Sequence, residues 1–107
     1  MKIVEIIRKA EGGMKEHYIT LVKGLLNKGH QVTALCDFPQ QDLNDLRLEG
    51  AQVIPYSFPD TIKPLADIRK IRELENIMSS VQPDILHCHG FKAGLIGRLA
   101  RRQPGCH

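Results

Sequence analysis

The chain has 107 residues, a formal net charge of +3, and 42% hydrophobic and 25% charged residues. This length allows one compact domain, and the apolar content excludes an intrinsically disordered chain. Its apolar runs are shorter than the about 18 residues of a membrane span, and its basic residues form no dense, aromatic-lined stripe, so we expect no nucleic-acid partner.

The cysteines and the N-terminus indicate the compartment. Cys36, Cys88 and Cys106 are odd in number and widely spaced, which argues against a secreted disulfide framework. The first residues lack the small-residue cleavage site of a signal peptide. We therefore expect a cytoplasmic protein. The mildly basic charge is compatible with phosphate-bearing ligands and with peripheral contact at an anionic inner membrane face.

Strand and helix patterns alternate along the chain, with short apolar runs followed by apolar residues at helical spacing. We expect strands at 2–7, 31–36, 51–56 and 85–89, and helices between Gly13 and Gly29, over 41–49, between Pro64 and Pro83, and over 91–102. This alternation predicts an α/β fold, a Rossmann-like parallel sheet in the order 3-2-1-4 with helices on both faces. The sequence ends where a fifth strand would begin, so the domain looks truncated.

Helical spacing also predicts which side chains face the core. On the second helix these are Leu43 and Leu46, with Leu48 as a further candidate. A longer apolar stripe runs from Leu65 to Val81. The inward residues of the last helix are Leu95, Ile96, Leu99 and Ala100.

Gly12 and Gly13 follow the first strand. In open parallel sheets ligands bind beyond the carboxyl ends of the strands, and glycine lets backbone N–H groups approach a phosphate. The N-terminus of the next helix adds a partial positive charge. The pair matches neither G-x-G-x-x-G nor a Walker A motif, so by itself it favours a simple tight turn.

The fourth strand ends in His87-Cys88-His89-Gly90. Strand alternation places His87 and His89 on one face and Cys88 on the other. We expect backbone groups to satisfy His87, which lies deeper in the strand. His89 lies at the mouth of the sheet beside Gly90, where an imidazole can bind a sugar hydroxyl or a phosphate, so we expect a functional role.

A metal site is a weaker alternative at the same strand. Cys106 and His107 bring the potential ligands near the C-terminus to five, together with His87, Cys88 and His89. The spacing does not match that of structural zinc sites, and Cys88 points away from both histidines. We therefore expect no metal here, and we interpret Cys36 and Cys88 as core residues.

The last helix contains Gly94 and Gly97, and each glycine costs roughly 1 kcal/mol relative to alanine. Close packing on the sheet is the favoured reason, and room for a ligand is the alternative. His17, in the first turn of the first helix, is as compatible with solvent exposure as with a place in the cleft.

Four stretches, 12–17, 25–32, 84–90 and 91–100, together resemble the N-terminal domain of family 4 retaining glycosyltransferases, which have the two-domain GT-B fold. The resemblance covers essentially the whole chain. It implies one acceptor-side domain over 1–107 and a nucleotide-sugar donor whose diphosphate approaches Gly12 and Gly13. The residues implied near the sugar or acceptor are His17, His89, Gly90, Lys92 and Gly94.

In this family the second domain supplies most donor contacts, and no such residues occur here. The resemblance thus implies a hexosyltransferase-like enzyme, without cofactor or metal, whose 1–107 portion is inactive alone; we assign no catalytic residue. The alternative is a stand-alone flavodoxin-like binding or regulatory module. An uncovered fourth strand, or the helix face with Leu95, Ile96 and Leu99, further predicts self-association.

Overall fold

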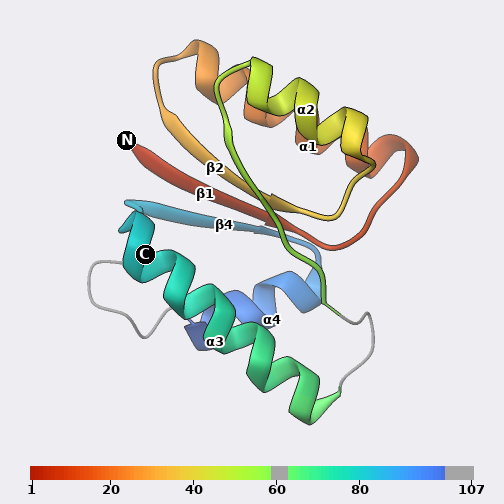
Figure 1. Cartoon of the computed structure of the whole chain (residues 1–107), viewed down its shortest axis with the longest axis vertical. Helices are drawn as coiled ribbons and strands as arrows, with labels where there is room; N and C mark the ends of the chain where they lie inside the picture. Colours follow the sequence, from red (N-terminus) through yellow and green to blue (C-terminus); the bar gives the residue numbers. More distant parts are fainter. Residues whose placement is uncertain (59–62, 101–107) are drawn as a thin grey trace.

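The computed structural model of the protein describes residues 1–58 and 63–100, without the side chains of Phe91 and Lys92 (Figure 1). Strands and helices alternate as predicted. The strands are β1 (Lys2–Ile7), β2 (Gln31–Cys36), β3 (Gln52–Pro55) and β4 (Ile85–His89), and the helices are α1 (Gly12–Asn27), α2 (Gln40–Leu48), α3 (Pro64–Val81) and α4 (Phe91–Ala100). Gly12 and Gly13 begin α1 rather than preceding it. The expected extension of α4 to residue 102 lies outside the described residues.

The four strands form one parallel sheet in the order β3-β2-β1-β4, which confirms the predicted order. β1 and β2 occupy the centre, and all their residues except the first of each strand are buried. β1 and β4 pair with Glu5 opposite His87 and Ile7 opposite His89. This register brings the carboxyl ends of the two strands together.

Helices cover both faces of the sheet, with α1 and α2 on one side and α3 and α4 on the other (Figure 1). Consecutive strand residues point to opposite faces, so Ile7 packs in the α1 and α2 layer while Ile6 packs in the α3 and α4 layer. The predicted Rossmann-like fold is therefore confirmed. Among the described residues, none of the helices has both the length and the apolar character that membrane crossing requires.

Three of the leucines predicted to face the core do not. Leu48 is 85% exposed because it lies two residues, and so about 200°, around the helix from buried Leu46. Leu65, in the first turn of α3, is 82% exposed, although Leu74 and Met78 of the same stripe are buried. Leu99 is exposed on α4, while Ile96 beside it is buried. Within the helix face proposed for self-association, Ile96 is therefore buried and Leu99 is exposed, and self-association stays a prediction.

Cys88 and Gly97 explain how α4 packs on the sheet. A Cβ atom added to Gly97 would lie 2.5 Å from Cys88 Sγ and 3.3 Å from Leu86 Cδ2. The glycine therefore allows the close approach of α4 to β4, which confirms packing as the reason for this residue. Gly94 has no heavy atom within 4 Å of the same position, so packing does not explain it.

Candidate functional site at the carboxyl edge of the sheet

The turn after β1 and the turn after β4 meet at the carboxyl edge of the sheet. Gly90 directly follows β4 with a φ of +96°, a conformation that favours glycine. Its Cβ position lies 3.6 Å from Cε of Met14, in the first turn of α1. The two glycine-containing segments singled out in the sequence are therefore neighbours in space.

The other residues predicted for the site differ in their exposure and in the cavities that they line. Gly13 is exposed, with no heavy atom within 4 Å of its Cβ position. Gly94 lines a cavity of about 230 Å³ together with Gly90, Leu95 and Arg98. His17 is exposed on α1. The side chain of Lys92 lies outside the described part of the chain.

A larger cavity of about 570 Å³ opens at the same edge, beyond β1 and β2. It is lined by Lys9, Ala10, Glu11, Lys15, Asp37, Phe38 and Pro39. Lys15 forms an ion pair with Asp42, with Nζ 3.1 Å from Oδ2. The sequence interpretation did not single out this cavity, whose lining combines two lysines with two acidic residues, Glu11 and Asp37.

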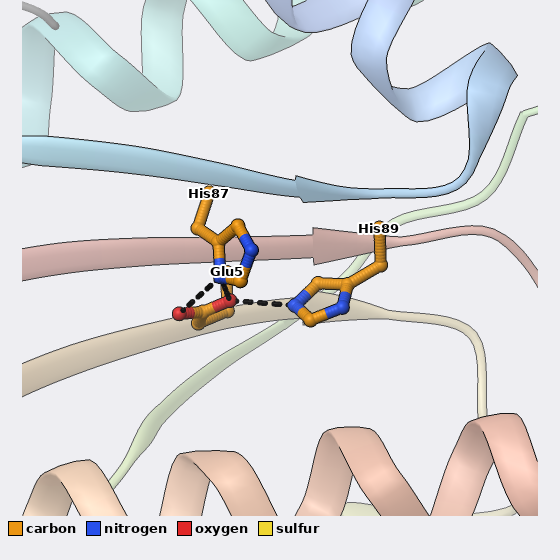
Figure 2. A group of neighbouring side chains, drawn as sticks. All are labelled: Glu5, His87 and His89. Carbon is orange, nitrogen blue, oxygen red and sulfur yellow. Dashed lines mark hydrogen bonds and ion pairs between the residues drawn. The ribbon is translucent and has the colours of Figure 1, made fainter.

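A buried carboxylate binds both histidines of β4. Glu5 lies in the middle of β1 and is almost fully buried. Its Oε1 accepts a hydrogen bond from Nε2 of His89 at 2.7 Å, and its Oε2 accepts one from Nδ1 of His87 at 3.2 Å. The same Nδ1 lies 2.9 Å from Oε1. Figure 2 shows the three side chains on one side of the sheet, with both imidazoles directed at the carboxylate. The expected common face of His87 and His89 is confirmed.

The two histidines differ in their surroundings. The side chain of His89 is 11% exposed, and its ring packs edge-on against Tyr18 with 5.2 Å between centroids. The Tyr18 hydroxyl donates a hydrogen bond to the backbone oxygen of Glu5 at 2.7 Å, and burial raises the pKa of this hydroxyl well above its usual value. His89 is thus held between a carboxylate and a packed aromatic ring.

The expectation for His87 was wrong. Its side chain is 51% exposed, and its hydrogen-bond partner is the Glu5 carboxylate rather than a backbone group. The physical reason is that, among the described residues, β4 is an edge strand, so the outer part of its α1 face has little cover.

Glu5 is the site residue that the sequence interpretation missed. A carboxylate inside an otherwise apolar central strand is itself a signal, because a buried charge needs a partner. The sequence alone does not give the register that places residue 5 opposite residue 87, so the partner could not be named.

Solved glycosyltransferase structures share this fold. The chain is similar to a glycosyltransferase from Rickettsia africae ESF-5, with a TM-score of 0.80 and 17% identity over 98% of this chain and 27% of that one. It is also similar to CalG4, the calicheamicin glycosyltransferase, with a TM-score of 0.63 and 20% identity over 94% of this chain and 30% of that one. A third similar structure is MurG of Acinetobacter baumannii, with a TM-score of 0.67 and 17% identity over 92% of this chain and 32% of that one. The chain therefore spans about a third or less of each of these proteins. No curated protein sequence matches it.

The family model named Glycosyltransferase Family 4 matches residues 11–107. The match includes both glycine turns and both histidines of β4, the residues that meet at the carboxyl edge. It favours a glycosyltransferase over a stand-alone flavodoxin-like module. Because the model covers nearly the whole sequence, the chain belongs to Glycosyltransferase Family 4.

Proposed function

We propose that this chain forms the acceptor-side, N-terminal domain of a GT-B enzyme that transfers a sugar from a nucleotide-sugar donor to an acceptor with retained anomeric configuration. The observation that carries the proposal is the meeting of the α1 N-terminus with the end of β4 at the carboxyl edge of the sheet. In parallel α/β sheets this edge, at the point where strand order reverses, is the usual ligand site.

The diphosphate of the donor would bind at the start of α1. The first amides of a helix have no partner within the helix, and the side chain of Glu11 makes no capping hydrogen bond to them. Gly12 and Gly13 are both exposed there. Amides and a helix dipole can stabilise an anionic leaving group without a metal ion.

The sugar or acceptor would lie toward β4. His89 stands at the end of this strand, and Gly90 and Gly94 line the smaller cavity together with Arg98. Lys92 and His17 complete the residues that we assign to this side. A second domain would supply the remaining donor contacts, so residues 1–107 alone would not transfer sugar.

Two matched glycine substitutions test the diphosphate role. In Gly13→Ala a methyl group would stand where the backbone is proposed to approach the donor, and in Gly24→Ala it would stand on an exposed stretch of the same helix. Neither Cβ has a heavy atom within 4 Å, so neither variant should disturb the fold. In the product of the complete reading frame, we expect Gly13→Ala to raise the KM for the donor about tenfold or more and Gly24→Ala to leave it unchanged. Equal KM values for the two variants would contradict the proposal.

A further inference from the structure

Glu5, His87 and His89 also form a potential set of metal ligands. One oxygen and two nitrogen atoms, one from each residue, all lie within 4.8 Å of one another (Figure 2). We propose that these three residues bind a divalent first-row transition metal ion of the Zn²⁺ type. This site lies apart from the proposed diphosphate site at α1, although it shares His89 with the proposed sugar side. Binding of the ion does not depend on the proposed sugar transfer.

The donor set has the chemistry of a three-ligand zinc site. Two imidazoles and one carboxylate are a known combination for Zn²⁺, with water in the fourth position. His87 and His89 are separated by one residue on a strand, so both rings leave the same face. The third ligand comes from the neighbouring strand, where Glu5 is in register with His87. Spacing along the sequence could not show this set, because 82 positions separate Glu5 from His87.

The distances are compatible with exchange of the hydrogen bonds for metal bonds. Bonds of about 2.0–2.1 Å in a tetrahedral site place neighbouring ligand atoms about 3.3 Å apart. The nitrogen–oxygen distances from Oε1 are 2.7 Å to His89 and 2.9 Å to His87. An ion between them would therefore require a widening of about 0.5 Å. His87 is half-exposed and can make this adjustment, while Glu5 and His89 stay fixed by burial.

Charge favours a cation at this place. Glu5 carries a carboxylate in the middle of the sheet, and buried charges in proteins are paired or coordinate metals. The two imidazoles satisfy its hydrogen bonds, and a bound cation would also compensate its charge. The exposed side of His87 leaves a path for the ion and its water. Imidazole ligands favour Zn²⁺ or Co²⁺ over Mg²⁺ and Ca²⁺, which prefer sites made of oxygen alone.

Titration of the chelator-treated chain tests the proposal. Zn²⁺ is followed by calorimetry, and Co²⁺ by its visible absorption, which reports tetrahedral coordination. We expect one ion per chain for either metal, no band from thiolate coordination, and no competition from excess Mg²⁺. The parent chain carries Cys106→Ser and His107→Asn, so that these two residues cannot supply ligands.

Three substitutions in this parent locate the ion. His87→Asn and Glu5→Gln should weaken binding by more than about tenfold, the lower end of what loss of a supporting group costs in metal sites. His17→Asn, at an exposed position of α1 outside the three ligands, should bind the metal ion with the affinity of the parent. His87→Asn decides the outcome even if Glu5→Gln fails to fold, because the His87 side chain is half-exposed. Absence of stoichiometric binding, or equal affinity of His87→Asn and the parent, would overturn the proposal.

Discussion

The α1 face of the sheet is closed over β2 and open over β4. Over β2, Cys36 is completely buried in a cluster that includes Tyr18 and Phe38. Over β4, on the other side of β1, His87 is half-exposed and contacts a carboxylate. A single strand thus separates an apolar core from a polar cluster on the same face. The polar side chains lie where the helix layer ends, because water can reach that part of the face and solvate them.

The closed region is tested most strongly by the thiol of Cys36. Burial, as the largest cause, raises its pKa from 9.0 to about 12, which reduces the thiolate fraction at pH 8 by about 1,000-fold. We expect its alkylation by iodoacetamide to be slower by about this factor than in the urea-unfolded chain, as measured by peptide mapping. Equal rates in the two states would show that the core is open over β2.

The same shift has a consequence for stability. The folded-state pKa is raised, so the folded state holds the proton more tightly than the unfolded state. The resulting stabilisation is complete below about pH 9 and is lost as the pH rises toward 12. Replacement by alanine in Cys36→Ala should make the free energy of unfolding less dependent on pH in this window.

The opposite face of β4 should be the least tolerant of added volume. Gly97→Ala places a methyl group 2.5 Å from Cys88 Sγ, and we expect a loss of about 1–3 kcal/mol in the free energy of unfolding. Gly94→Ala, one turn earlier on α4 and without a close neighbour, should instead gain up to about 1 kcal/mol. Urea denaturation of both variants measures the difference. The same sign for both would contradict the packing account of Gly97.

The open region should be the most tolerant. His87→Ala removes a half-exposed ring, and Glu5 keeps its hydrogen bond to His89. We expect the free energy of unfolding to fall by no more than about 1 kcal/mol, as for most substitutions at partly exposed positions. A loss above about 2 kcal/mol in urea denaturation would mean that this part of the sheet is as closed as the core over β2.

Periodicity in the sequence was sufficient to predict the fold, because it indicates the type and the order of the strands and helices. The strands at Gln31–Cys36 and Ile85–His89 have the predicted bounds, and the sheet has the predicted order. Leu48 was misplaced because an apolar residue at a helix end can face solvent at little cost.

The site was predicted less completely than the fold. The position of His89 beside Gly90 followed from strand polarity, since parallel strands end at a common edge. The Glu5 contacts did not follow, because they depend on the register of β1 against β4. The predicted roles of all seven site residues stay predictions: Gly12, Gly13, His17, His89, Gly90, Lys92 and Gly94.

The proposed function is tested most directly by a transfer assay on the product of the complete reading frame and on residues 1–107 alone. A panel of nucleotide sugars is supplied with acceptors, and the anomeric configuration of the product is read by proton NMR. We expect the longer protein to transfer sugar with retention, and the 107-residue chain to show no turnover and weak or no donor binding. Turnover by the short chain, or an inverted product from the longer protein, would contradict the account.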